Sequence, residues 1–298
     1  MNSPLMYFLE ILVSGVAVGS IYALIALGFV LIFKATGVIN FAQGEVIMIA
    51  AFIAYYLLAK AGLPFWAAVL VTLVAAGTLG VITERLVLRP MLGESHFSVV
   101  MVTVGLSIFL RSMAGIFFGH DNHVMPNPFP ETPLNIGGVV LSHTHLWTML
   151  VSFGLMAAFL LFFKFARLGL GMRATANDQY TATLMGVNIK KVFALTWALS
   201  FAIAGVAGIF LANVMVLNIG LAFTAISAFP AVILGGLQSV PGAIIGGLAI
   251  GIIENLAGGY LDQVIGGGVK DVTPFVILFL VLMVRPYGLF GQEEVERV

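Results

Sequence analysis

Residues 192–253 read VFALTWALSFAIAGVAGIFLANVMVLNIGLAFTAISAFPAVILGGLQSVPGAIIGGLAIGII and contain no Asp, Glu, Lys or Arg over 62 positions. About 20 apolar residues, each rising 1.5 Å along a helix, cross the roughly 30 Å hydrocarbon core of a bilayer. This stretch therefore has room for two or three crossings. Residues 11–33 form a second uncharged stretch, 23 positions long, near the start of the chain. Both stretches predict membrane-spanning helices.

The composition of the whole chain agrees with this interpretation. Apolar residues make up 61% and charged residues 9% of the 298 positions, whereas about 25% of residues are charged in a typical soluble chain. The absence of cysteine excludes disulfides and thiolate metal sites, and the zero net charge gives no electrostatic footprint for nucleic acid. Because positions 1–9 carry no Lys or Arg, we expect a retained first span and not a cleaved signal peptide.

Charged residues and turn residues divide the chain into nine predicted spans. We therefore expect an all-α integral membrane protein, a polytopic helical bundle of eight to ten spans that forms a single domain over residues 1–298. The predicted spans are 9–33, 39–59, 63–83, 97–118, 145–163, 192–212, 221–237, 241–261 and 272–284.

Basic residues are distributed unevenly among the connections between these spans. Only Lys60 and Lys270 fall in one set of alternate connections. Cytoplasmic loops are enriched in Lys and Arg, so we expect the N-terminus outside and the C-terminus inside. The other set holds Lys34, Arg85, Arg89, Lys164, Arg167, Arg173, Lys190, Lys191, Arg285 and Arg297.

Two connections are long. Residues 119–144 form the predicted extracytoplasmic loop, and the pairs His120 with His123 and His143 with His145 lie in it or at its end. Their spacing is compatible with a metal, but nothing indicates a closed ligand shell, so we interpret them as unliganded surface histidines. Residues 164–191 form the predicted cytoplasmic loop, in which 174–185 have the pattern of a short helix on the membrane surface.

Polar residues at the start of the second span are the first candidates for a solute pathway. Residues 46–59 are too few to cross a bilayer alone, so the span should extend back through Glu45 and bring Asn40 and Gln43 to membrane depth. Such groups are costly in lipid and should face the bundle interior. The alternative is a solvated Glu45 at the cytoplasmic boundary.

Two further charges, Arg111 and Glu254, lie inside predicted spans. Arg111 is eight residues before Gly119, about 12 Å along a helix, so its side chain can extend to the outer headgroups. We favour this snorkelled arrangement over an internal ion pair of Arg111 with Glu45 or Glu254.

A glycine-rich segment that includes Gly235, Gly236, Ser239 and Pro241 separates two predicted spans. Pro241 cannot donate a helical hydrogen bond, so we expect a turn or helix break here. It is either a tight cytoplasmic hairpin or a break that lines the pathway. Glycines near 15–28 and 235–251 are more typical of closely packed membrane helices than of an internal repeat.

Four motifs resemble the permease subunits of branched-chain amino-acid ABC importers, the LivH type. Together with the pattern of spans, they extend this resemblance over nearly the whole chain. The motifs are GVINFAQGE at 37–45, RATANDQYTATLMGVN at 173–188, GGLQSVPGAIIGG at 235–247 and RPYGLFG at 285–291.

This resemblance implies a non-catalytic subunit that works by alternating access. Its partners would be two ABC ATPase subunits that bind ATP and Mg²⁺, a second homologous permease and an extracytoplasmic substrate-binding protein, and the chain itself would hold no cofactor. Consistently, the sequence has no phosphate-binding loop and no hydrolase motif. The predicted cytoplasmic helix would be the coupling helix that docks on an ATPase, through Arg173, Ala174, Asn177, Asp178, Ala182 and Gly186. Gly186 would end this helix as a left-handed C-cap. The resemblance also implies that the protein lies in the inner membrane of a bacterial cell.

Several alternatives remain open at the level of sequence. The same resemblance extends to permeases for urea, short amides and other amino acids. An ion-coupled secondary transporter would also have broken helices and buried polar residues, but it would not need a helical cytoplasmic loop of this length. An intramembrane enzyme would need paired catalytic groups, for which only Glu45 and Glu254 are available. The segment 174–185 could instead be an amphipathic helix resting on lipid.

Overall fold

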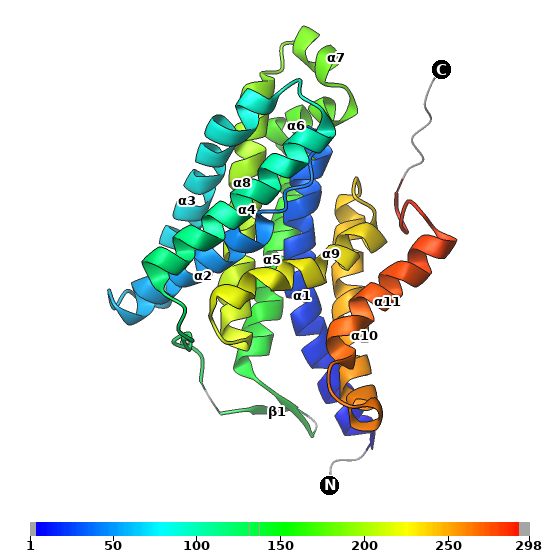
Figure 1. Cartoon of the computed structure of the whole chain (residues 1–298). Helices are drawn as coiled ribbons and strands as arrows, with labels where there is room; N and C mark the ends of the chain where they lie inside the picture. The colour runs from blue at the N-terminus through cyan, green and yellow to red at the C-terminus, as the bar shows by residue number, and fades with distance from the viewer. Residues whose placement is uncertain (1–3, 131, 137, 292–298) are drawn as a thin grey trace. The chain divides into compact units, whose positions relative to one another are not determined.

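A computed structural model describes residues 4–130, 132–136 and 138–291, and Figure 1 shows that they are almost entirely helical. The chain divides into two compact units, each assembled from separate parts of the sequence. The first unit comprises Met1–Val30, Phe129–Phe153 and Ile226–Val298, and the second comprises Leu31–Pro128 and Gly154–Ala225.

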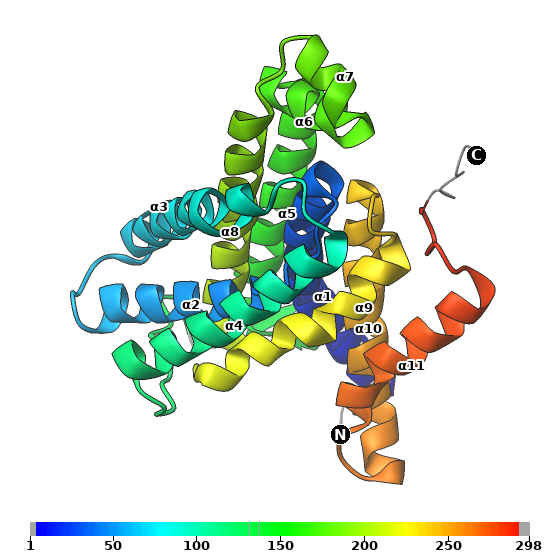
Figure 2. The same ribbon diagram turned by 45° about the horizontal axis from the view of Figure 1, so that its top comes forward.

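The second unit is built around helix α8, which packs against α2 and α3, while α4 packs against α2 (Figures 1 and 2). A short π-helical turn, η1, and a 3₁₀ turn, η2, extend α3. The elements of this unit are α2 (Gln43–Ala59), α3 (Phe65–Thr83), η1 (Glu84–Leu88), η2 (Arg89–Met91), α4 (His96–Phe118), α6 (Arg167–Asn177), α7 (Gln179–Leu184), α8 (Ile189–Val214) and η3 (Ile219–Phe223).

Glycine allows the helices of the second unit to approach closely. A Cβ atom on Gly208 of α8 would collide with the carbonyl oxygen of Ile47 in α2, and one on Gly80 of α3 would lie 2.5 Å from the carbonyl oxygen of Trp197 in α8. Apolar helices gain little hydrophobic free energy by associating in lipid, so close backbone packing of this kind must hold them together.

The first unit contains the remaining helices and a two-stranded antiparallel hairpin in which Leu134 pairs with Leu141. Helices α1, α5 and α9 contribute residues to both units. The elements are α1 (Pro4–Thr36), β1 (Leu134–Ile136), β2 (Val139–Leu141), α5 (His143–Phe165), α9 (Thr224–Gly235), α10 (Val240–Ile265) and α11 (Val269–Val284).

The glycine-rich stretches of α1 and α10 pack directly against each other. A Cβ on Gly251 would collide with the backbone of Gly19, and one on Gly247 would collide with the backbone of Ala23. The helices thus meet backbone to backbone along two consecutive turns. This contact confirms the interpretation of these glycines as packing residues.

Six helices within the described residues are long and apolar enough to cross a membrane. They correspond to six of the nine predicted spans. The segments Gln43–Ala59 and Ile219–Gly235 are apolar but shorter, and α11 has only 16 residues. The six long segments are Pro4–Thr36, Phe65–Met91, His96–Phe118, His143–Phe165, Ile189–Val214 and Val240–Ile265. The predicted helices are therefore present, whereas the count of eight to ten crossings stays a prediction.

The contact between α1 and α10 predicts a strong effect of a side chain at Gly251. The substitution Gly251→Val should lower the thermal unfolding midpoint of the purified protein in detergent, because overpacking costs about 1–3 kcal/mol even where side chains can yield, and here the obstacle is backbone. Gly154→Val in α5 is the matched control, since a Cβ on Gly154 meets no atom within 4 Å. Equal midpoints for the two variants would contradict this packing.

Candidate functional site

Helix α2 begins at membrane depth and not at a membrane surface. The chain leaves α1 at Thr36 and runs without helical structure to Gln43. On the way, Thr103 Oγ1 lies 3.2 Å from the carbonyl oxygen of Ile39 and accepts a hydrogen bond from the backbone N–H of Phe41 at 3.3 Å. Thr103 is four residues, about 6 Å, from the middle of the membrane-spanning helix α4. The irregular segment therefore lies deep along α4.

Arg111 and Glu45 form an ion pair about 12 Å further along α4 than Thr103. Arg111 lies four residues beyond the middle of α4, and its Nη2 is 2.5 Å from Glu45 Oε1 in the first turn of α2. Glu45 is only 2% exposed, so the alternative of a solvated Glu45 is wrong. The favoured snorkelled arrangement of Arg111 is also wrong, because its guanidinium is held by the buried carboxylate.

The other two predicted polar residues of this segment belong to the same cluster. Asn40 and Gln43 are fully buried. The Asn40 amide donates to Gln43 Oε1 at 3.1 Å, Asn40 Oδ1 accepts from the N–H of Ala42 at 3.1 Å, and the Gln43 amide donates to Ser200 Oγ of α8 at 3.4 Å. These bonds satisfy polar groups that would otherwise be costly to bury. The sequence thus correctly predicts that they face the protein interior.

The short 3₁₀ helix η3 packs over the start of α2. A Cβ on Gly44 would collide with the carbonyl oxygen of Ala222, so only glycine allows this approach. The ring of Phe223 lies beneath the Arg111 guanidinium, with 4.2 Å between the guanidinium carbon and the ring centroid. A cation over an aromatic face is stabilised by the ring quadrupole. We refer to Asn40, Gln43, Glu45, Arg111 and Phe223 as the polar cluster.

The glycine-rich predicted residues lie in the first unit, at the turn between α9 and α10. Gly235 ends α9, Gly236 has a positive φ of 94°, and Pro241 lies in the first turn of α10. The Ser239 side chain caps α10 by accepting a hydrogen bond from the N–H of Gly242 at 3.1 Å. The prediction of a turn or helix break is confirmed.

The motif RPYGLFG at 285–291 packs on this same turn. The N–H of Leu289 donates to the carbonyl oxygen of Leu234 at 2.8 Å, and a Cβ on Gly236 would lie 2.7 Å from the nitrogen of Gly291. Two of the four motifs therefore contact each other, although 37 residues separate them in the sequence. This contact fixes the end of α9.

Glu254 lies in α10, about 20 Å along the helix from Pro241. It is buried, accepts a hydrogen bond from the Tyr22 hydroxyl at 3.2 Å and lies 3.9 Å from Nζ of Lys270. These partners hold α1, α10 and the start of α11 together. The five predicted pathway residues of the first unit thus form two separate groups and not one site.

The predicted cytoplasmic loop, 164–191, folds into two helices, α6 and α7, which both views show at one end of the second unit (Figures 1 and 2). The prediction of a single helix over 174–185 is therefore wrong, because two helices share this loop. Asp178 has φ −159° and ψ 115°, an extended conformation that ends α6 after Asn177. A new helix begins at the next residue, so Asp178 forms the break between α6 and α7.

Local hydrogen bonds define both ends of α7. The Asp178 carboxylate accepts from the N–H of Thr181 at 2.7 Å, as an N-capping residue does. At the other end Gly186 has φ +85°, its N–H bonds to Thr183, and the N–H of Val187 bonds to Ala182. This is the Schellman arrangement, in which glycine is preferred for its left-handed backbone. The expectation of a left-handed C-cap at Gly186 is confirmed.

The two sides of α7 differ sharply. Ala182 is buried, whereas Tyr180, Leu184 and Met185 are strongly exposed, Met185 at 81%. Arg173 and Ala174 lie in α6, where the Arg173 guanidinium is 5.9 Å from the ring centroid of Phe163. We refer to residues 173–186 as the coupling segment; it holds all six of the predicted coupling residues.

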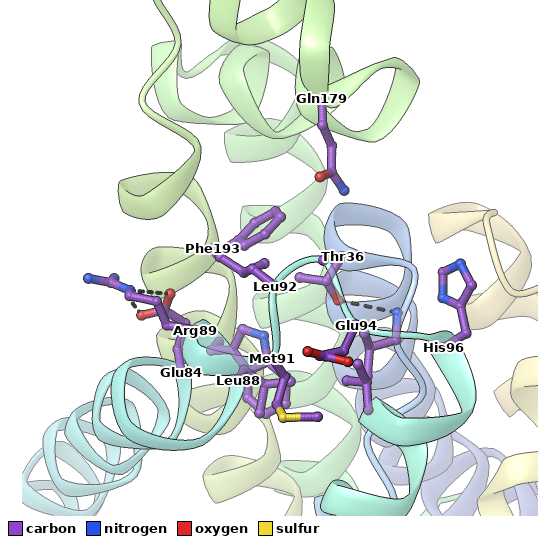
Figure 3. Close-up of a pocket in the computed structure, with 14 residues that line it drawn as sticks. Thr36, Glu84, Leu88, Arg89, Met91, Leu92, Glu94, His96, Gln179 and Phe193 are labelled. Atoms are coloured by element: carbon purple, nitrogen blue, oxygen red, sulfur yellow. Dashed lines mark hydrogen bonds and ion pairs between the residues drawn. The ribbon is translucent and has the colours of Figure 1, made fainter.

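A cavity of about 180 Å³ lies beside the coupling segment. Figure 3 shows Gln179, the first residue of α7, pointing toward it from one side, and the ion pair of Glu84 with Arg89 on another. The Arg89 Nε and Nη2 atoms lie 3.1 and 2.7 Å from the two carboxylate oxygens of the buried Glu84. Phe193 of α8 also lines the cavity. The turns η1 and η2, which extend α3, therefore line this cavity together with α7 and α8.

The predicted histidine pairs do not behave alike. His123 is not a surface residue: its backbone pairs with Leu217, its ring centroid lies 4.7 Å from that of Tyr55, and its Nε2 is buried. In the part of the chain that the structure describes, no three His, Asp or Glu side chains group in a way that could hold a metal ion.

Sequence reasoning missed several members of these sites. Phe223 carries no sequence signal, because an aromatic residue in an apolar stretch is ordinary. Ser200 and Thr103 are polar residues inside apolar spans and could have been found by that criterion. The pair Glu84 and Arg89 has a spacing of five, which only the π-helical turn of η1 brings into contact.

A comparison with protein-family models identifies the family of this chain. The model described as "Branched-chain amino acid transport system / permease component" matches residues 11–284. This chain belongs to that family.

Full-length relatives agree with the family match. The chain is 37% identical, over 98% of each sequence, to the high-affinity branched-chain amino acid transport system permease protein BraD of Pseudomonas aeruginosa. It is 36% identical, over 100% of each sequence, to the corresponding permease proteins LivH of Salmonella typhimurium and Escherichia coli K12. Members of this family are permease components of transport systems, so this permease is a membrane transport subunit.

A solved structure shares the fold. PsaBC from Streptococcus pneumoniae in complex with Fab has a TM-score of 0.52 to this permease, with 16% sequence identity and coverage of 95% of this chain and 94% of that one. At this identity the likeness concerns the fold alone.

The capping geometry of α7 yields a prediction for Asp178. Removal of an N-cap side chain costs about 1 kcal/mol, so Asp178→Ala should speed amide exchange of Thr181 about fivefold. Asp178→Asn keeps an oxygen acceptor and is the matched control. Hydrogen–deuterium exchange measured by mass spectrometry on peptides covering α7 distinguishes the two variants, and equal exchange in both would contradict the cap.

Proposed function

We propose that this permease is the membrane-spanning subunit of an ATP-binding cassette importer for branched-chain amino acids. Two ATPase subunits supply the energy, a second homologous permease completes the pathway, and an extracytoplasmic binding protein delivers the substrate. The observation that carries this proposal is the coupling segment, whose helix α7 is capped and strongly exposed on one side, in a membrane protein of this family.

The coupling segment has the features of a docking element. Tyr180, Leu184 and Met185 present a small apolar surface on α7, which a groove on another protein can bury. The break at Asp178 and the Schellman turn at Gly186 fix the length of the helix. An amphipathic helix on lipid has a long apolar face and Lys or Arg on its polar face, whereas α7 has six residues and no Lys or Arg, so we favour a protein partner.

Motion of α7 has a direct route into the membrane helices. Gln179 lines the same cavity as Phe193 of α8 and the Glu84–Arg89 pair at the end of α3. In the proposed mechanism, ATP binding moves the ATPases toward each other and they pull α7 with them. The displacement then passes to α3 and α8, and the pathway between the paired permeases changes the side to which it opens.

We infer a topology with the N-terminus outside and the coupling segment in the cytoplasm, supported by the distribution of basic residues. In this topology the short elements α2, η3–α9 and α11 complete a bundle of eight to ten crossing segments. Three helices contribute residues to both units, which supports one permease domain over residues 1–298. The protein lies in the inner membrane.

Reconstitution tests the proposed function. The complete complex of both permeases and both ATPases, placed in proteoliposomes with the loaded binding protein, should take up radiolabelled leucine only when ATP is available. The same permeases without ATPases are the control. Leucine uptake driven by a proton or sodium gradient in that control would contradict the proposal.

The exposed apolar residues of α7 should determine ATPase docking. The double substitution Leu184→Asp with Met185→Asp is expected to abolish co-purification of the ATPases in mild detergent, because it places two charges in an apolar contact. Val124→Asp is the matched control: Val124 is equally exposed, at 82%, but lies in the predicted outer loop. Retention of the ATPases by the double variant would count against the docking surface.

The absence of cysteine allows a direct test of topology. Single substitutions Met185→Cys and Val124→Cys introduce exposed thiols into a cysteine-free background. A membrane-impermeant maleimide should label Cys at 124 in right-side-out vesicles and Cys at 185 only in inside-out vesicles. Labelling of both from the same side would refute the proposed orientation.

A further inference from the structure

Arg111 lies at a depth where a charged side chain is costly unless it contacts protein, water or a solute. It lies near the middle of α4, about 10 Å from the end of the helix. Its guanidinium is fixed between the Glu45 carboxylate and the Phe223 ring. Ionisable groups at such positions are rare and usually line a pathway for a solute or ion.

The guanidinium retains unused hydrogen-bonding capacity. Arginine has five N–H donors in a planar fork, and the structure records only the Nη2 bond to Glu45. The Nε atom is buried and has no partner among the described residues. At the same time the Arg111 side chain is 31% exposed, so a ligand can reach it.

The surroundings specify the chemistry of that ligand. A carboxylate is the partner that the fork of an arginine fits best, because it accepts two parallel hydrogen bonds. Phe223, 52% exposed, and Ile108, one turn before Arg111 on α4, offer apolar surface beside the guanidinium. Carboxylate and apolar group therefore belong to one small molecule.

The charge balance points to a zwitterion. Glu45 already neutralises Arg111, so an added anion without a cation would leave the cluster with a net negative charge at membrane depth, which is costly. An amino acid brings its own ammonium group and leaves the cluster neutral. Uncharged urea or an amide has one carbonyl oxygen and lacks the pair of carboxylate oxygens that accepts two parallel N–H bonds from the guanidinium.

We propose that Arg111 binds the carboxylate of the amino acid in transit, with its apolar side chain against Phe223 and Ile108, and that Glu45 orients Arg111 for this contact. The inference rests on the proposed importer function and names the residue that meets the substrate inside the membrane.

Two variants remove the planar pair of N–H donors at position 111 without leaving an unpaired charge in the interior. Arg111→Lys keeps the positive charge opposite Glu45 but loses the planar pair of donors. The double variant Glu45→Gln with Arg111→Gln removes both charges and leaves no unpaired charge in the interior. Arg85→Gln is the matched control, since Arg85 is exposed and lies outside the polar cluster.

The readout is the number of leucine molecules taken up per ATP hydrolysed, measured on the complete complex with its loaded binding protein. Loss of a bidentate charge-assisted contact should lower leucine uptake at least about tenfold in both variants, while stimulation of ATP hydrolysis by the binding protein persists. Arg85→Gln should match the wild type.

Leucine uptake at the wild-type rate in either variant would overturn the inference. A parallel loss of uptake and hydrolysis in both variants would also overturn it, because a purely structural pair would act in that way. If the wild-type complex shows no ATP-driven leucine uptake, or takes up urea instead, the proposed function itself fails.

Discussion

The ion pair between Arg111 and Glu45 is the interaction on which the second unit depends. Irregular backbone is tolerated at membrane depth only where protein or water surrounds it. Segment 37–42 leads into α2, and segment 215–218 leads into η3, which packs against α2. The pair joins α2 to α4 at this point, and the Phe223 ring attaches η3 to the same guanidinium. Without it, Glu45 would be an uncompensated charge in the interior, which typically costs 3–5 kcal/mol.

The same unit also holds the coupling segment, and the proposed mechanism uses this proximity to connect an ATPase outside the membrane with the polar cluster. Helix α8 packs against both α2 and α3 and lines the cavity next to α7 with Phe193. Its Ser200, two turns further along, accepts the hydrogen bond from Gln43 in the polar cluster. The contacts of α8 with α2 and α3 are made through glycine and backbone atoms. Because such contacts are close-packed, a displacement of α8 is passed on to α2 and α3.

Much of this arrangement could be predicted from sequence. Uncharged runs located the long helices, the cost of buried amides placed Asn40 and Gln43 inside the protein, and the glycine at 186 indicated where α7 ends. The partner of Arg111 could not be predicted, because helix spacing gives its distance from the membrane surface but not which carboxylate a neighbouring element brings to it. The break at Asp178 was missed for a similar reason: a capping side chain at an exposed position resembles an ordinary polar residue within a helix.

A double-mutant cycle on Glu45 and Arg111 tests the central claim most directly. Thermal or chemical unfolding of the purified permease is measured for the wild type, Glu45→Gln, Arg111→Gln and the double variant. The structure predicts a coupling free energy of at least about 1.5 kcal/mol, as measured for close charge pairs elsewhere, with the double variant more stable than Arg111→Gln alone. Strictly additive effects of the two substitutions would show that the pair does not hold α2 to α4.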